Sequence, residues 1–146
     1  MSFLSLNPDN IANYAALYCA VFNAPPWHDG WSETAARERL LHFSCFPRFA
    51  GLALHDGDTP IALAFGWGER WIAHWSFHLK ELCVAPQLQG QGHGQRLLSE
   101  FERQLAEADY GETFLLTGAT VPARAFYERN GYRAQDQVVM GKPLPA

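Results

Sequence analysis

The sequence VAPQLQGQGHGQRLLSEFERQL, residues 84–105, places three glycines at alternate positions directly before a predicted helix. These are Gly90, Gly92 and Gly94. Leu97, Leu98, Phe101 and Leu105 recur three and four apart, as one face of a helix over roughly residues 94–108 requires. One interpretation is a tight turn in which glycine merely permits unusual dihedral angles. The other is an anion site, because such a turn can gather backbone N–H groups beside the unpaired donors of a helix start.

Two common phosphate-binding motifs fit this stretch poorly. The nucleotide P-loop needs Lys followed by Ser or Thr after its last glycine, and Gln95 and Arg96 follow Gly94 here. The dinucleotide fingerprint GxGxxG needs a glycine at position 95, and it normally follows the first strand of its domain. Neither nucleotide nor dinucleotide binding is therefore favoured.

The composition is that of a soluble globular chain. Its 146 residues are 48% hydrophobic and 18% charged, which predicts a single domain over residues 1–146. The formal net charge of −4 argues against a nucleic-acid partner. No apolar run approaches the ~20 residues that span a bilayer, and the start MSFLSLNPDN does not look like a signal peptide. We therefore expect a cytoplasmic protein with no membrane partner.

The cysteine and element patterns add two expectations. Cys19, Cys45 and Cys83 are far apart and form no Cys/His cluster with metal spacing, so we expect free thiols and no metal. Along the chain the periodicity predicts the order β-α-α-β-β-β-α-β-α-β, with a last strand in AQDQVVMGK, residues 134–142. This order indicates an α/β (α+β) fold in which helices cover a mixed sheet.

Two landmarks in this order resemble the GCN5-related N-acetyltransferase (GNAT) superfamily. The stretch with Gln89, Gly92 and Gly94 is similar to its acyl-CoA pyrophosphate loop, Gln/Arg-x-x-Gly-x-Gly/Ala, and ELCVAP before it is similar to the end of its central strand. Downstream, ARAFYERNGY (123–132) is similar to the family's AxxFYxxxGF segment. The resemblance implies a mixed, mostly antiparallel central sheet with helices on both faces. It also implies acetyl transfer from acetyl-CoA to a primary amine.

The resemblance assigns most of the expected cofactor contacts. The expected acetyl-CoA contacts are Cys83, Val84, Gln89, Gly90, Gln91, Gly92, His93, Gly94, Gln95, Arg96, Thr120, Ala123 and Phe126. His93 replaces a usual aliphatic residue and Thr120 a frequent asparagine, while Arg96 is either a phosphate contact or an exposed helix residue. A backbone N–H near Cys83 or Val84 is expected to stabilise the carbonyl oxygen as it gains charge.

Proton transfer needs a donor and a base. The tyrosine that matches Tyr127 points at the cofactor sulfur in the family, so Tyr127 is the candidate proton donor; otherwise it is a core aromatic residue. Glu81 and His78 are candidate bases on the central strand, and ordered water is the alternative to both. Three residues apart on a regular strand, they are expected to face opposite sides of the sheet.

The acceptor side is expected where the tryptophans gather. Trp27 and Trp31 lie between the first two predicted helices, and Trp67, Trp71 and Trp75 would share one face of an unbroken strand. They form either a hydrophobic core or dimer interface, or an aromatic pocket for a cation with Asp29 or Glu69 as counter-charge. The second interpretation favours a small cationic amine as acceptor and makes Trp27, Asp29, Trp31 and Glu69 the candidate substrate residues.

Several functions stay open on this basis. The leading hypothesis is an N-acetyltransferase in which the amine attacks acetyl-CoA directly in a ternary complex. The acceptor is then a small amine, a protein N-terminus or a lysine. The alternative is a non-catalytic acyl-CoA-binding or sensor module. A homodimer is neither required nor excluded.

Overall fold

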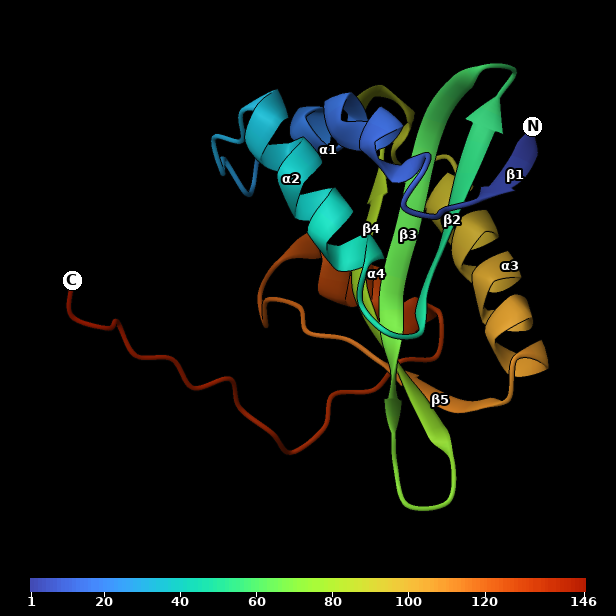
Figure 1. Ribbon diagram of the computed structural model, residues 1–146, viewed down its shortest axis with the longest axis vertical. Coiled ribbons are helices and arrows are strands. Elements are labelled where there is room, and N and C mark those ends of the chain that lie inside the picture. Colours follow the sequence, from blue (N-terminus) through green and yellow to red (C-terminus); the bar gives the residue numbers. More distant parts are fainter. The chain divides into compact units, whose positions relative to one another are not determined.

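The computed structural model describes all 146 residues as two units, Met1–Leu116 and Thr117–Ala146. The larger unit carries five strands, three α-helices and two short 3₁₀ helices, and the smaller unit carries one α-helix (Figure 1). In chain order the elements are β1 (Ser2–Ser5), η1 (Ile11–Tyr14), α1 (Ala15–Phe22), α2 (Glu33–Ser44), β2 (Phe49–Asp56), β3 (Thr59–Arg70), β4 (Trp75–Val84), η2 (Pro86–Leu88), α3 (His93–Glu107), β5 (Tyr110–Phe114) and α4 (Pro122–Arg129).

The five strands form one sheet in the order β1-β2-β3-β4-β5. The pairs from β1 to β4 are antiparallel, whereas β5 runs parallel to β4 after the α3 crossover. This arrangement confirms the expected mixed, mostly antiparallel sheet.

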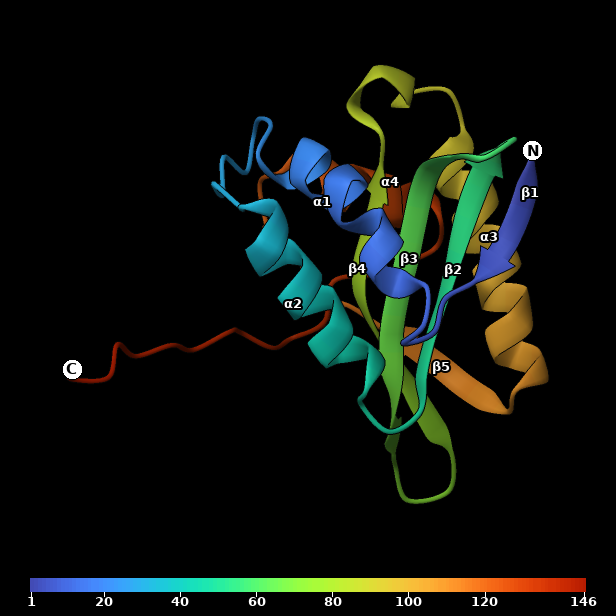
Figure 2. The ribbon, with the colours of Figure 1, turned by 45° about the horizontal axis from the view of Figure 1, so that its top comes forward.

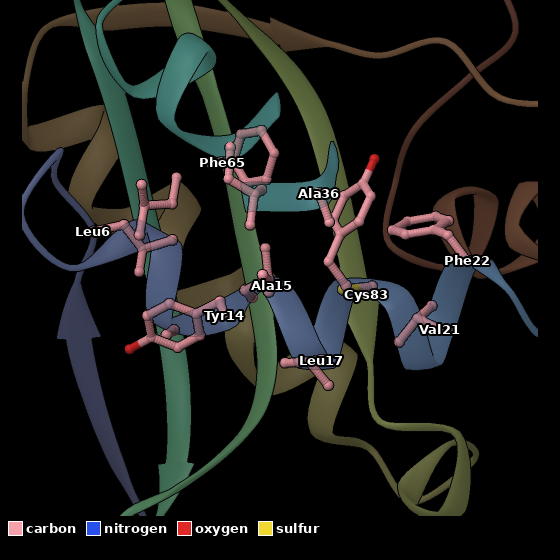
Figure 3. Close-up of a cluster of buried hydrophobic side chains, with 14 of the residues drawn as sticks. Leu6, Tyr14, Ala15, Leu17, Val21, Phe22, Ala36, Phe65 and Cys83 are labelled. Carbon is pink, nitrogen blue, oxygen red and sulfur yellow. The ribbon is translucent and has the colours of Figure 1, made fainter. Parts of the chain in front are cut away.

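Helices cover both faces of that sheet. On one face α1 and α2 pack against β3 and β4, and Figure 3 shows Ala15 of α1 near Phe65 and Cys83. On the other face α3 buries the apolar stripe predicted from its sequence, and Phe101 meets Phe77 of β4 with ring centroids 5.4 Å apart. In Figure 2 α1 and α2 lie in front of the sheet and α3 behind it.

The helix starts follow local sequence signals. Ser32 caps α2, because its hydroxyl accepts a hydrogen bond of 3.1 Å from the Ala35 N–H, and Glu33 follows in the first turn. The α4 helix begins at Pro122 and ends before Gly131, whose φ of 92° is left-handed. No helix combines the length and apolar character that a membrane span requires.

Two expectations about strands are wrong. Residues 71–74 form a loop between β3 and β4, so Trp67 and Trp75 lie on paired strands. Trp67 pairs with His78 and Arg70 pairs with Trp75, so the two tryptophans point to opposite faces. The expected last strand is also absent, because Val138, Val139 and Met140 are at least 75% exposed and no neighbouring strand buries them.

Candidate functional site

The glycines before α3 are required by the backbone conformation. Gly90 has a φ of 76° and Gly92 a φ of 86°, both in the left-handed region that side chains disfavour. A Cβ atom added at either position would meet no atom within 4 Å. The turn therefore exposes its main chain to open space, as a bound diphosphate would need.

The helix α3 begins at His93 with uncapped donors. Gly92 is its N-cap residue and provides no side-chain hydrogen bond, and the Arg96 N–H donates to the Gly92 carbonyl at 3.0 Å. The amides of His93, Gly94 and Gln95 precede that bond, so they have no acceptor inside the helix. Together with the partial positive charge of the helix start, they favour an anion at this end of α3.

The side chains of the loop mainly hold the loop itself. Gln89 Nε2 donates to the Val84 carbonyl at 3.0 Å, and Gln91 Nε2 donates to the Gln87 carbonyl at 3.5 Å. The Arg96 guanidinium lies over the ring of Phe3, 5.6 Å from its centroid. The loop is thus shaped by its glutamines, while phosphate contacts from Arg96 and His93 stay predictions.

The central strand β4 loses its second neighbour half-way along its length. Pairing with β5 runs from Trp75 to His78, whereas pairing with β3 continues to Val84. In Figure 1 β4 continues upward beyond the end of β5 to the loop that precedes α3. The end of β4 therefore has backbone groups that no strand binds on the side away from β3.

The direction of those backbone groups follows from the hydrogen bonds around them. The Ala85 N–H donates to the Ile61 carbonyl at 2.8 Å, so the backbone groups of Ala85 point toward β3. Backbone groups alternate along a strand, so those of Cys83 point toward β3 as well. Leu82 and Val84 then point away from β3, in agreement with the bond from Gln89 to the Val84 carbonyl. This alternation favours Val84 over Cys83 as an N–H donor to a ligand, and it adds Leu82, which the sequence did not single out.

A bulge in β4 brings the two candidate bases to the same face of the sheet. Phe65 pairs with Glu81 but Gly66 pairs with Leu79, so Lys80 is an extra residue in β4. A Cβ atom on Gly66 would lie 1.8 Å from the His78 carbonyl oxygen, so this close approach needs glycine. The expectation that His78 and Glu81 face opposite sides is therefore wrong, because the bulge reverses the alternation between them.

Glu81 lies in a partly buried hydrogen-bond network with one residue from α1 and one from α2. Its Oε1 accepts hydrogen bonds from Tyr18 Oη at 3.4 Å and from Arg39 Nη2 at 3.3 Å, and Arg39 Nε donates to Tyr18 Oη at 2.9 Å. Only 14% of the Glu81 side chain is exposed, and this burial raises its pKa above the ordinary glutamate value, while Arg39 opposes the rise. Burial likewise raises the pKa of the Tyr18 hydroxyl.

His78 lies in an aromatic environment on the same face. Its ring stacks on Phe114 at a centroid distance of 4.7 Å and meets the edge of Trp67 at 5.1 Å. Burial lowers the pKa of His78, and the nearby charge of Glu69 opposes this effect. A lowered pKa favours the neutral imidazole, which is the form that can accept a proton.

The expected acceptor residues fall into two places in the larger unit. Trp27, Asp29 and Trp31 lie in the connection from α1 to α2, where Trp31 Nε1 donates to Asp29 Oδ2 at 3.1 Å. The Arg39 guanidinium lies 5.2 Å from the Trp31 ring centroid, so the protein's own cation covers the ring that we expected to bind an acceptor. Glu69 lies near the end of β3, on the face of Trp67.

The second landmark lies in the smaller unit. Ala123, Phe126 and Tyr127 belong to α4, and Thr120 is exposed in the turn before it. The Tyr127 ring contacts Phe126 at a centroid distance of 5.2 Å and Tyr132 at 5.5 Å. This helix is the last one in the predicted element order, whereas the roles of these four residues in cofactor binding and proton donation stay predictions.

The comparison with known families decides the identity of the fold. A sequence model described as "Acetyltransferase (GNAT) domain" matches residues 49–134, more than half of the chain. The chain belongs to the GNAT acetyltransferase family. This match includes the central strand, the glycine loop, α3 and α4. A search of curated proteins gave no match.

Solved structures of other GNAT acetyltransferases share the fold at low sequence identity. An aminoglycoside acetyltransferase from an uncultured soil metagenomic sample, in complex with sisomicin, aligns with a TM-score of 0.77 at 16% identity, covering 99% of this chain and 96% of that chain. Aminoglycoside N-acetyltransferase AAC(6')-Iy in complex with CoA has a TM-score of 0.77 at 11% identity, covering 97% and 93%. A ribosomal-protein-alanine N-acetyltransferase from Brucella melitensis biovar Abortus 2308 has a TM-score of 0.78 at 11% identity, covering 99% and 100%.

The sequence did not predict two residues of the candidate site in this GNAT chain. Arg39 and Tyr18 are 42 and 63 residues from Glu81 along the chain, so no local spacing connects them. The available signal was weak: Arg39 adjoins Leu40 on a helix whose buried side faces the sheet. No group of three His, Cys, Asp or Glu side chains is placed to hold a metal ion.

Proposed function

We propose that this GNAT protein transfers the acetyl group of acetyl-CoA to a primary amine by direct attack in a ternary complex. The observation that carries the proposal is the end of β4, where unpaired backbone groups lead into a glycine turn and the uncapped start of α3. Backbone donors are thus available for both an acyl oxygen and a diphosphate in one continuous stretch, residues 82–95.

The larger unit offers a chemically suitable cradle for coenzyme A. The first-turn amides of α3 and the left-handed Gly90 and Gly92 would hold the diphosphate, with Gln89 fixing the turn to Val84. In the smaller unit we assign Thr120, Ala123 and Phe126 to cofactor binding on the family motif alone. Acetyl-CoA supplies the activated thioester when it is bound.

Three groups of the protein then act in the reaction: one accepts a proton, one stabilises a negative charge and one donates a proton. An ammonium group has no lone pair, so Glu81 accepts its proton, directly or through water, with His78 as the alternative base. The Val84 N–H donates to the carbonyl oxygen in this proposal, as that atom gains negative charge. Tyr127 Oη donates a proton to the departing thiolate, whose conjugate thiol has an ordinary pKa of roughly 8.5.

The acceptor we favour is a small cationic amine. Two of the solved structures with a similar fold are aminoglycoside acetyltransferases. In addition, the largely buried carboxylate of Glu81 suits an ammonium group. A protein N-terminus is the second candidate, because a ribosomal-protein-alanine N-acetyltransferase has the same fold. Both candidates present a primary amine, so they share the proton chemistry and differ in what surrounds the nitrogen.

A thiol-release assay tests this proposal. Purified protein is incubated with acetyl-CoA and a panel of aminoglycosides, polyamines, amino acids and peptides, and CoA binding is measured separately by calorimetry. We expect CoA binding and acceptor-dependent thiol release, with Tyr127→Phe lowering turnover but leaving CoA affinity nearly unchanged. CoA binding without release for any amine would favour the non-catalytic acyl-CoA module, and no CoA binding would reject both.

A further inference from the structure

Arg39 is held in one orientation by four partners. Its guanidinium lies between two aromatic rings, 5.2 Å from the Trp31 centroid and 4.7 Å from the Phe43 centroid. Its Nε donates to Tyr18 Oη and its Nη2 donates to Glu81 Oε1. Cation–π contacts and charge-assisted hydrogen bonds in a partly desolvated place are stronger than on an open surface.

The arrangement leaves one oxygen of Glu81 without these partners. Both the Tyr18 and the Arg39 hydrogen bonds go to Oε1 and neither goes to Oε2, a carboxylate oxygen that can itself accept hydrogen bonds. The charged and titratable groups around this carboxylate are Arg39 from α2, Tyr18 from α1, and Lys80 and Cys83 from β4 itself. Arg39 is the larger of the two cationic influences that oppose the effect of burial on Glu81.

We infer that Arg39 is a positioning residue that binds Glu81 through Oε1 and so presents Oε2 to the ammonium group of the acceptor. The inference rests on the proposed function and adds a recognition rule to it. The Trp31 ring is already covered by Arg39, so the acceptor nitrogen is received by a carboxylate rather than by that ring. The ammonium proton passes to Oε2, and the nitrogen keeps the electron pair it needs for attack.

The pH dependence of acetylation separates this role from a merely structural one. Glu81 must be ionised to accept a proton, so activity falls as pH drops through its pKa. Arg39→Met removes the cation and keeps an apolar stem, so the pKa of Glu81 rises and the acidic limb of kcat/KM moves to higher pH. One pH unit of movement lowers kcat/KM about tenfold at a fixed pH on that limb.

Two further variants serve as controls. Arg37→Met removes a cation from the same helix whose guanidinium instead donates to the Ala12 carbonyl, and we expect a wild-type pH profile. Arg39→Lys keeps the charge without the planar fork, so it should restore the limb only in part. We also expect Arg39→Met to raise KM for the amine while KM for acetyl-CoA stays unchanged.

A readout that needs no turnover completes the test. In protein labelled with ¹³C at glutamate carboxyls, the Glu81 signal is assigned by its loss in Glu81→Gln and titrated without ligand. We expect a higher Glu81 midpoint in folded Arg39→Met than in wild type or Arg37→Met. If Arg39→Met is active and changes neither the Glu81 titration midpoint nor the acidic limb of kcat/KM, the inference alone is overturned. If the protein binds CoA but acetylates no amine, the proposed function is overturned.

Discussion

The two faces of the sheet are built from the same strands but carry different kinds of contact. Against α3 the contacts are apolar, with Leu97, Leu98 and Phe101 at most 2% exposed. Against α1 and α2 there is an apolar core too, but a carboxylate, a guanidinium and a phenol on this face bind one another. Burying such groups costs free energy unless they are paired, and here the three groups hydrogen-bond one another.

The largest expected effect is a loss of stability when the apolar face against α3 is disrupted. Phe101→Ala removes a ring packed on Phe77 and should lower the free energy of unfolding by about 3–5 kcal/mol. Urea denaturation measures this loss, and the exposed Arg103→Ala on the same helix is the control, expected to change little. The folded variant should keep the wild-type pH profile of acetylation. A loss below about 1 kcal/mol would contradict the close packing of the buried Phe101 ring against Phe77.

The next effect concerns the polar face. Glu81→Gln keeps the shape of the side chain but cannot accept the ammonium proton, so kcat should fall about a hundredfold, equivalent to ~2.7 kcal/mol. Because burial raises the pKa of Glu81, the acidic limb of the wild type should lie above the ordinary glutamate value of about 4.3 and disappear in the variant. Steady-state rates across pH measure both changes.

His78→Gln is the matched test of the alternative base on the same face. If it removes the rate and the pH limb while Glu81→Gln retains them, His78 is the base. If both variants retain the wild-type rate, ordered water performs the proton transfer and the polar network only supports the fold.

The smallest effect concerns the glycine turn between β4 and α3. Gly92→Ala places a Cβ on a left-handed residue, at a cost of about 1–2 kcal/mol, and should weaken CoA binding by roughly tenfold or more. Gly57→Ala is the matched control, because Gly57 also has a left-handed φ and open space around it but lies in the β2–β3 turn. Calorimetry should show a CoA affinity loss in the first variant only. Equal affinities in both would place the diphosphate elsewhere.

The sequence predicted what depends on near neighbours. The glycine turn, the apolar stripe of α3 and the last helix of the predicted order each depend on residues close together in the sequence, and the structure contains them. The bulge at Lys80 was not predictable in this way, because it depends on the register of β4 against Gly66 on another strand. The pairing of Arg39 with Glu81 likewise depends on how α2 lies on the sheet.

The wrong predictions follow the same division. Treating Trp67, Trp71 and Trp75 as parts of one unbroken strand ignored the hairpin loop at 71–74 and put Trp67 and Trp75 on one face. The β-branched pair at Val138 and Val139 predicted a strand, but β-propensity describes a fit to neighbouring strands, and both side chains are exposed. Local pattern therefore located the glycine turn that we propose binds the cofactor, while the face that carries Glu81 required the tertiary structure.

The central claim is that backbone amides of residues 89–95 and the end of β4 bind coenzyme A, and amide chemical shifts test it most directly. ¹⁵N-labelled wild-type protein is titrated with CoA and the backbone amide shifts are followed to saturation. The account predicts that the largest saturable shifts within the larger unit include His93, Gly94 and Gln95 at the start of α3, together with Leu82 and Val84. Saturable binding that leaves these five amides unmoved, or no binding at all, would contradict it.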